Sequence, residues 1–389
     1  MEHGGRFGVV TTALAAATLA ASAVAGAPTP PAPPARATAP PELPLTLSAD
    51  AWITSRARFL MGARLVIEAR GGAVDAAVER AFAEVARLEA VLSNWRPDSE
   101  VSRLNDAAAA GPVTVSDDLY TAVDAALRWA ESTDGAFDPT VEPLVRALGL
   151  RGAEGILPGA GAPPAAGPAM PKPVGWRGVR LDPGRRTVGF AAAGMGLDFG
   201  GIGKGMALDA AALVLRDGGV EAALLDFAGQ VLVFGSGPDA GRWRVGIADP
   251  EDRAGAALVV DLPAGSLSTS GNSERAVGTG GRRVGHILDP HTGRPVAWNG
   301  SVTVLADDAT AADALSKALF VLGPERGTVW ADQHGVQVLY LERDARGRLV
   351  RRSAGALFRG VAGRVPASGA VDGGSPGVAR SRQSTEGSR

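Results

Sequence analysis

The 389-residue sequence contains no cysteine. Disulfides, thiolate metal sites, cysteine nucleophiles and a lipid attached through an N-terminal cysteine are therefore excluded. The sequence also lacks a large excess of either charge, because it has 39 basic and 41 acidic residues and a formal net charge of −2. Such a chain offers no general attraction for nucleic acid or for an anionic membrane surface. We expect no nucleic-acid partner, and any partner must be recognised by a local site.

The N-terminal apolar run is too short and too weakly hydrophobic for a membrane span. It extends from Phe7 to Ala21, follows Arg6, and is succeeded by small residues that end at Ala25. This order is typical of a cleavable export signal. We expect residues 1–25 to be a signal peptide, the mature protein to work in the periplasm or cell envelope, and no stable membrane span to remain after cleavage. An uncleaved anchor is the alternative.

Composition divides the rest of the chain into one main domain and its flanks. Residues 26–48 are rich in Pro and Ala, which predicts an extended linker. Residues 360–389 are rich in Gly, Ser and Arg, which predicts a disordered tail. The domain itself is expected over residues 49–359, with a surface-loop insertion at Gly152–Pro173.

Hydrophobic spacing predicts both helices and strands within this domain. Apolar residues recur every three or four positions from Val74 to Leu92, which predicts a helix that ends near Ser93. A second helix is expected after Ser116, whose side chain can cap it, and another from Thr310. Strands are expected at Ala223–Phe227, Val231–Phe234, Ala257–Val260, Val302–Leu305 and Val336–Leu341. This order, without steady βαβ alternation, favours an α+β fold with a mostly antiparallel sheet.

The densest glycine segment runs from Gly200 to Gly205. It follows Leu197-Asp198-Phe199 and precedes a helix-like alanine run. Glycines let backbone amides approach a phosphate, and Lys204 adds a full positive charge, so the segment has the chemistry of an anion cradle. It matches neither the Walker spacing nor the dinucleotide spacing. A tight strand-to-helix turn without a ligand remains the alternative.

Histidine is scarce, with four residues in the whole chain. His3 lies in the expected signal peptide, so His286 and His291 gain weight as candidates for a general base near neutral pH. Both belong to a polar segment that follows a strand-like stretch. A structural role is the alternative for each.

Two acidic segments can be interpreted as helix starts. Thr310 and Asp313 have the spacing of a capping box, although a carboxylate beside a phosphate site could instead bind Mg²⁺. The segment Arg96 to Glu100 predicts a turn that opens a short helix, with Asp98 or Ser99 as its cap.

Six segments of the chain follow one another in an order that is typical of one enzyme family. They are Leu92 to Asn105, Gly135 to Val141, Leu197 to Gly205, Leu267 to Gly271, Gly285 to Pro295, and Ala312 to Gly323. Together they resemble the FAD:protein FMN transferase family, also called the ApbE family. The resemblance covers roughly residues 50–345.

The resemblance implies a T-fold-like domain that binds FAD, uses Mg²⁺, and attaches FMN to a Thr or Ser of an exported flavoprotein while releasing AMP. By similarity, His286 is the catalytic base. The implied cofactor-binding residues are Lys204, Gly203, Gly205, Thr269, Ser270, Gly271 and Asp138, and the implied metal ligands are the carbonyl of Gly201 and the carboxylate of Asp313. The resemblance does not say what Asp138 does beside the cofactor, and no role follows for Asp289 or His291.

The chain departs from the family pattern at two places. Lys317 stands where the family usually has Thr as a further metal ligand, and an ammonium cannot bind Mg²⁺. Lys317 could point away and leave a water in that place, or its charge could partly substitute for the cation. The second departure is Asn272-Ser273, where an acidic residue and an aromatic one are expected.

Two other functions are compatible with the same residues. Water could replace the acceptor hydroxyl, which would make the protein an FAD pyrophosphatase that yields FMN and AMP. The protein could also be a non-catalytic exported flavin-binding protein, which Lys317 makes conceivable and His286 argues against.

Overall fold

The computed structural model describes residues 54–107, 110–148, 150, 173–251, 255–272, 276–279 and 282–359. All of them belong to one unit of the chain, Pro40–Arg389. The expected signal peptide, linker and C-terminal tail lie outside the described residues, as does the expected insertion Gly152–Pro173 except for Pro173. Within the described ranges, no helix is both long and apolar enough to cross a membrane.

An eight-stranded sheet, antiparallel at every pairing, forms the centre of the domain. Its strands, in spatial order, are β1 (Thr54–Leu60), β2 (Ala63–Gly71), β6 (Val220–Phe227), β7 (Gln230–Phe234), β10 (Gly265–Gly271), β15 (Ser301–Ala306), β16 (Gln337–Arg343) and β17 (Leu349–Ala354). All five strands expected from the sequence are confirmed, and four of them belong to this sheet. The α+β class with a mostly antiparallel sheet is confirmed.

Helices and small sheets complete the domain. The helices are α1 (Val74–Leu92), α2 (Glu100–Ala107), α3 (Asp117–Ser132), α4 (Glu142–Ala147), α5 (Gly203–Asp217), α6 (Ala309–His334) and α7 (Ala356–Arg359), with 3₁₀ turns at Pro139–Val141 and Trp176–Gly178. The small sheets comprise β3 (Val113–Thr114), β4 (Val179–Asp182) and β5 (Thr187–Phe190); β8 (Trp243–Ala248) and β9 (Ala256–Leu262); β11 (Ala276–Thr279) and β12 (Arg282–Gly285); and β13 (Leu288–Asp289) and β14 (Arg294–Pro295).

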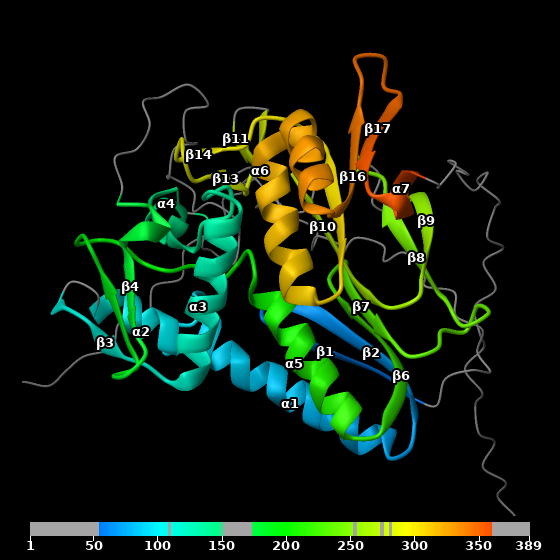
Figure 1. Ribbon diagram of the computed structural model, residues 1–389, viewed down its shortest axis with the longest axis horizontal. Helices are drawn as coiled ribbons and strands as arrows, with labels where there is room; N and C mark the ends of the chain where they lie inside the picture. Colours follow the sequence, from blue (N-terminus) through cyan, green and yellow to red (C-terminus); the bar gives the residue numbers. More distant parts are fainter. Residues whose placement is uncertain are drawn as a thin grey trace, which may run out of the picture. The chain divides into compact units, whose positions relative to one another are not determined.

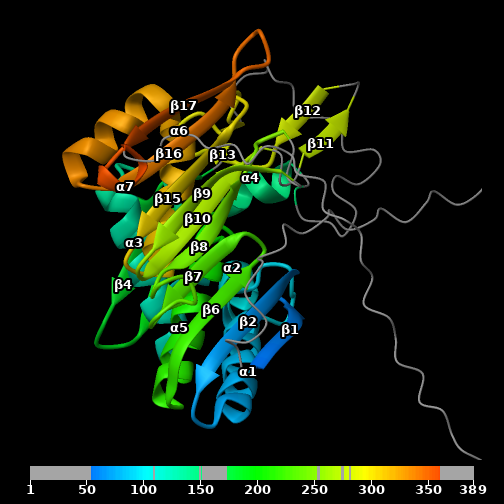
Figure 2. The ribbon, with the colours of Figure 1, turned by 90° about the vertical axis from the view of Figure 1, so that its right-hand side faces the viewer.

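The two faces of the large sheet are covered differently, by helices on one side and by a hairpin on the other (Figure 1, Figure 2). Alternate residues of β2, such as Leu65 and Ile67, are buried in one core cluster with α1 and α5. On the opposite face, Trp243 of β8 and Leu258 of β9 are buried in a second cluster with β6, β7 and β10. The sheet therefore separates two cores, as strand alternation requires.

The predicted helix starts are mostly confirmed. Helix α1 has the predicted bounds, and the hydroxyl of Ser116 accepts a hydrogen bond from the Leu119 amide at 3.2 Å as the N-cap of α3. Ser99 caps α2, because its hydroxyl accepts a hydrogen bond from the Ser102 amide at 3.1 Å. These local caps were visible in the sequence because each depends on residues only three positions apart.

The start of α6 differs from the expectation. The helix begins at Ala309, and its N-cap is Asp308, whose carboxylate accepts a hydrogen bond from the Ala311 amide at 2.7 Å. Thr310 therefore lies inside the first turn, and the capping box proposed for Thr310 and Asp313 is wrong. Further along, Gly323 adopts a φ of 74° ahead of Pro324, which breaks α6 into two segments.

Helices α5 and α6 begin at the same place and run away from each other (Figure 1). Their contact is backbone against backbone at Gly205. An ideal Cβ at that position would lie 2.3 Å from the carbonyl oxygen of Ala309 and 2.7 Å from the Cα of Thr310. Only glycine permits this approach, because neither backbone atom can rotate out of the way.

We predict that Gly205→Ala destabilises the protein by about 1–3 kcal/mol, because the added methyl overpacks a backbone contact. This loss is expected even though alanine favours helix over glycine. Urea unfolding followed by circular dichroism measures the change. Gly72→Ala is the matched control, since a Cβ at position 72 meets nothing within 4 Å. Equal stability of the two variants would show that α5 and α6 can separate without cost.

Candidate active site

Two asparagines hold the segment that leads into α5. The side-chain amides of Asn94 and Asn105 donate hydrogen bonds to the carbonyl oxygen of Leu197 at 2.7 and 2.9 Å. Their side-chain oxygens accept hydrogen bonds from the amides of Phe199 and Leu197, at 3.2 and 2.8 Å. The sequence motif from Leu92 to Asn105 thus contributes to the site by fixing the backbone of Leu197 to Phe199, which precedes the glycines.

The glycine segment is a tight turn whose amides are largely used internally. The Gly200 amide donates to a carboxylate oxygen of Asp198 at 2.7 Å, and the Gly203 amide donates to the carbonyl of Phe199 at 2.7 Å. The Gly205 amide is bound to Asp313 at 3.1 Å. The expectation that these glycine amides cradle a phosphate stays a prediction; in the structure the amides of Gly200, Gly203 and Gly205 take part in the turn itself, and positive charge beside it comes from side chains.

Carboxylates cap both helices across their contact. Ile202, the N-cap residue of α5, provides no side-chain hydrogen bond, and Asp313 of α6 supplies one to Gly205 instead. In return, Asp209 of α5 accepts hydrogen bonds from the amides of Ala309 and Thr310, both at 2.8 Å. Burial raises the pKa of Asp209, while these hydrogen bonds act against the rise. Each helix thus satisfies amides that the other leaves unpaired.

Asp313 is fully buried between two lysines. Its Oδ1 lies 2.8 Å from the Nζ of Lys317 and 3.9 Å from the Nζ of Lys204. Burial alone would raise the pKa of Asp313, but the two ammonium groups and the Gly205 amide outweigh it and hold the pKa below its ordinary value of 3.8. We refer to Lys204, Asp313 and Lys317 as the lysine–aspartate cluster.

Three serine hydroxyls join β10 to α6 beside this cluster. The Ser316 hydroxyl lies 2.8 Å from the Ser270 hydroxyl and 3.2 Å from the Ser268 hydroxyl. The Lys317 ammonium is 3.4 Å from the same Ser316 oxygen. Ser270 is thereby close to the cluster. Thr269 lies on the other face of β10 and bonds to Thr303 at 2.9 Å, so the structure does not bring Thr269 and Ser270 to one side.

Gly271 ends β10, and Asn272 follows it. The Asn272 side chain donates a hydrogen bond to the carbonyl of Trp298 at 2.9 Å. Gly285 lies directly against Asn272, because a Cβ at position 285 would be 1.9 Å from its side-chain oxygen. The residue after Gly285 is His286. Asn272, the first residue of the second departure from the family pattern, therefore has a packing role. Ser273, the other residue of that departure, lies outside the described residues.

His286 lies at a bend between β12 and β13 and is partly exposed. Gly285 before it packs against Asn272, which directly follows β10, and Ile287 after it is buried in a cluster with Leu315 and Leu319 of α6. The carbonyl of Ile287 also accepts a hydrogen bond from the Val296 amide at 2.9 Å. The backbone on both sides of His286 is thus fixed against the strand and the helix that carry Ser270 and Lys317.

The other motif carboxylates organise turns. Asp138 is buried and accepts hydrogen bonds from the amides of Thr140 and Trp176 at 2.7 and 3.0 Å, and burial raises its pKa. Asp289 accepts a hydrogen bond from the His291 amide at 2.9 Å, and the His291 ring lies 3.1 Å from the carbonyl of Asp134. These partners give all three side chains structural roles, and the assignment of Asp138 to the cofactor stays a prediction.

The donor set does not fit the expected Mg²⁺ ion. Mg²⁺ needs near-octahedral oxygen ligands at 2.0–2.1 Å. Both oxygens of Asp313 are already occupied, one by Lys317 and one by Gly205. Gly201, the other implied ligand, lies against the Lys317 stem, since a Cβ there would be 3.3 Å from Cγ of Lys317. Across the described ranges, no group of three or more His, Asp or Glu side chains could hold a metal ion.

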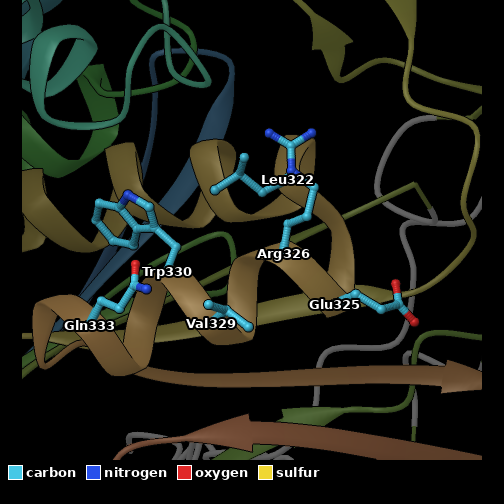
Figure 3. A pocket seen from close by; sticks show the side chains of 6 residues that line it. All are labelled: Leu322, Glu325, Arg326, Val329, Trp330 and Gln333. Atoms are coloured by element: carbon cyan, nitrogen blue, oxygen red, sulfur yellow. The ribbon is translucent and has the colours of Figure 1, made fainter.

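A surface pocket of about 420 Å³ lies along α6, mostly on the segment after Gly323 (Figure 3). Its lining residues are Leu322, Glu325, Arg326, Val329, Trp330 and Gln333. None of these belongs to the lysine–aspartate cluster or to the six sequence motifs except Leu322. The pocket therefore adds nothing to the candidate active site.

Sequence reasoning missed Asp209 and Ser316 as parts of the site. Asp209 lies in an alanine-rich helical run, and nothing in its spacing indicates that it caps another helix 100 residues later. Ser316 directly precedes Lys317 in a quoted motif, and its role depends on β10. Both contacts are tertiary, so a local pattern carries no sign of them.

Comparison with known proteins gives consistent matches over most of the chain. The ApbE family model matches residues 61–340. The FAD:protein FMN transferase of Treponema pallidum is 34% identical over 325 residues, which cover 78% of this chain and 88% of that protein. The FAD:protein FMN transferase of Escherichia coli K12 is 31% identical over 264 residues, which cover 65% of this chain and 73% of that protein.

Solved structures match as well. The ApbE protein of Thermotoga maritima has a TM-score of 0.69 and 29% identity, with 79% of this chain and 98% of that chain covered. The flavinyl transferase ApbE of Pseudomonas stutzeri has a TM-score of 0.66 and 28% identity, with coverage of 79% and 96%. The fold expected from the motif order is thereby confirmed.

We predict that Asp313→Asn lowers the free energy of unfolding at pH 7 by about 2–3 kcal/mol, because two ammonium groups lose their carboxylate. The folded-state pKa lies below the ordinary value, so ionised Asp313 stabilises the fold above that value and the contribution is lost as pH falls through the folded pKa. Urea unfolding at pH 7 and pH 3 should therefore show a difference from wild type that shrinks in acid.

Asp217→Asn is the matched control for this charge change, because Asp217 is exposed at the end of α5. It should alter stability by less than about 0.5 kcal/mol at either pH. A stable Asp313→Asn variant at pH 7 would mean that the lysines do not depend on this carboxylate.

Proposed function

The chain belongs to the ApbE family, and we propose that it transfers FMN from FAD to a Thr or Ser hydroxyl of an exported flavoprotein, with release of AMP. The enzyme class is FAD:protein FMN transferase, and FAD is the substrate. The observation that carries the proposal is the meeting of two motifs, Leu197 to Gly205 and Ala312 to Gly323, in one cluster with two ammonium groups. A diphosphate substrate requires positive charge of this kind.

The reaction is a displacement at phosphorus. The acceptor hydroxyl oxygen forms a bond to the phosphorus of the FMN half, and the bond from that phosphorus to the bridging oxygen breaks. AMP leaves with the bridging oxygen, and the hydroxyl proton goes to a base. Such a transfer depends on alignment of the attacking and leaving oxygens and on cations beside the phosphoryl oxygens.

The described residues suit the separate parts of this reaction. Lys204 and Lys317 are partly exposed, at 27% and 17%, so both ammonium groups can reach a substrate while Asp313 stays buried. His286, as an imidazole near neutral pH, can accept the hydroxyl proton. Because the donor set does not fit Mg²⁺, no step of this mechanism uses a metal ion.

The flavin-facing residues remain part of the proposal. Gly203 and Gly205 lie on α5, which carries Lys204, and Ser270 and Gly271 lie on β10, which is joined to α6 through the Ser270–Ser316 hydrogen bond. Thr269 faces the other side of β10, where it bonds to Thr303, and its place beside the flavin stays a prediction.

Incubation of the purified protein with FAD and an acceptor flavoprotein tests the proposal. Covalent flavin fluorescence on the acceptor supports the transferase. Release of free FMN in the presence of the acceptor would instead support the pyrophosphatase, and tight FAD binding without any product would support a binding protein. The three outcomes are distinguished by gel fluorescence and by chromatography of the released nucleotides.

We predict that His286→Ala lowers FMN transfer by about a hundredfold or more and leaves FAD affinity nearly unchanged, because a base acts on the proton-transfer step. Transfer is measured by acceptor fluorescence and affinity by quenching of flavin emission. His334→Ala is the matched control, since His334 stacks on Trp330 at the end of α6, outside the site. Equal losses of affinity and transfer in His286→Ala would assign this histidine a structural role.

The proposed location is outside the cytoplasm, in the periplasm or cell envelope. It depends on the order of Arg6, the apolar run and Ala23-Val24-Ala25, which has the form of an export signal. We predict a mature N-terminus near Gly26, which mass spectrometry of the exported protein can measure. Soluble cytoplasmic protein that retains Met1 would contradict this location.

A further inference from the structure

We propose that the ammonium of Lys317, fixed by Asp313 beside Lys204, takes the place of a divalent cation on the diphosphate of FAD. The inference rests on the proposed function, because it names the group that binds that substrate's diphosphate. Its consequence is that FAD binding and FMN transfer by this protein do not require Mg²⁺.

The position of Lys317 excludes a bound cation at Asp313. Its Nζ lies 2.8 Å from Asp313 Oδ1, on the side of that oxygen where a bound metal ion would have to lie. Ser316, the next hydroxyl along the helix, is already bonded to Ser270 at 2.8 Å and to the Asp313 carbonyl at 2.9 Å. A divalent ion at Asp313 Oδ1 would have to displace the Lys317 ammonium, because both would occupy the same place beside that oxygen.

The side chain of Lys317 is held by packing as well as by charge. A Cβ on Gly201 would lie 3.3 Å from Cγ of Lys317 and 3.1 Å from the Phe137 ring. The lysine stem therefore passes close to Gly201, where a Cβ would be in tight contact with it. An ammonium that pointed into solvent would need neither this close approach nor the buried carboxylate, so the first of the two arrangements left open by the sequence does not occur.

The cluster keeps an excess of positive charge for a ligand. Two ammonium groups face one carboxylate, and the helix termini add little because their amides are already bonded to carboxylates of Asp209, Asp308 and Asp313. Each ammonium has three donors and no acceptor. Lys317 can therefore hold Asp313 with one donor and offer others to phosphoryl oxygens.

The use of lysine at this place is itself unusual for the chain. Lys172, Lys204 and Lys317 are the only lysines among 39 basic residues, and two of the three meet at Asp313. Arginine serves almost everywhere else. The stem of Lys317 lies beside Gly201 and its compact ammonium reaches Asp313, whereas a planar guanidinium needs a wider fork-shaped space. The site thus selects the smaller cation.

The test measures FAD affinity of the full exported protein, by flavin fluorescence quenching, in excess EDTA and in excess Mg²⁺. We expect the wild-type affinity and the rate of FMN transfer to be the same in both, within about twofold. Lys317→Met should weaken FAD binding in EDTA by about ten- to hundredfold, because a charge-assisted hydrogen bond to the diphosphate is lost. Arg326→Met removes one positive charge from an exposed part of α6 and should bind FAD as the wild type does.

Two results would overturn the inference. One is loss of wild-type FAD affinity or transfer in EDTA with recovery on addition of Mg²⁺, a measurement that needs no variant. The other is a Lys317→Met protein, folded by circular dichroism, that binds FAD as tightly as Arg326→Met. The proposed function fails separately. Metal-independent FAD binding without covalent flavin on the acceptor would refute the transferase and leave the inference about Lys317 intact. Transfer that requires Mg²⁺ would refute the inference about Lys317 and leave the transferase intact.

Discussion

The backbone contact between α5 and α6 is the constraint on which the active site depends. Helix N-termini repel each other, since both carry unpaired amides and partial positive charge. Here they meet at Gly205, and carboxylates exchanged between the helices satisfy the amides: Asp209 caps α6, and Asp313 caps α5. The contact therefore requires a glycine at position 205 and two acids around it, Asp313 fully buried and Asp209 half-buried.

The lysine positions follow from that arrangement. A fully buried carboxylate is costly unless charge and hydrogen bonds compensate it. Asp313 caps α5 through one oxygen, and its other oxygen faces Lys317, with Lys204 further away. The cap thus creates the need for a cation, and the cation is then available to a substrate on its exposed side. Structural stability and substrate binding share the same three side chains.

The sequence predicted features whose causes are local. Helix α1 and the Ser116 cap follow from spacings of three and four residues, so the pattern and the structure agree. The motif order predicted the family because many residues contribute to it. One interpretation failed for the opposite reason. The Thr310 capping box has the right local spacing, but the carboxylate of Asp209, from a distant segment, takes the Thr310 amide instead. No spacing rule includes such partners.

A cation built from lysines would also change what the protein must organise before the reaction. A metal ion arrives with water ligands that have to be exchanged and oriented, whereas Lys317 is already oriented by Asp313 and by the space at Gly201. Charge that is fixed before the substrate binds needs no rearrangement when the phosphoryl group is transferred. The site would carry less total charge than a metal site, so alignment of the acceptor hydroxyl and proton removal by His286 would have to contribute correspondingly more to the rate. The chemistry at His286 and the substitution at Lys317 are therefore linked through the same transition state.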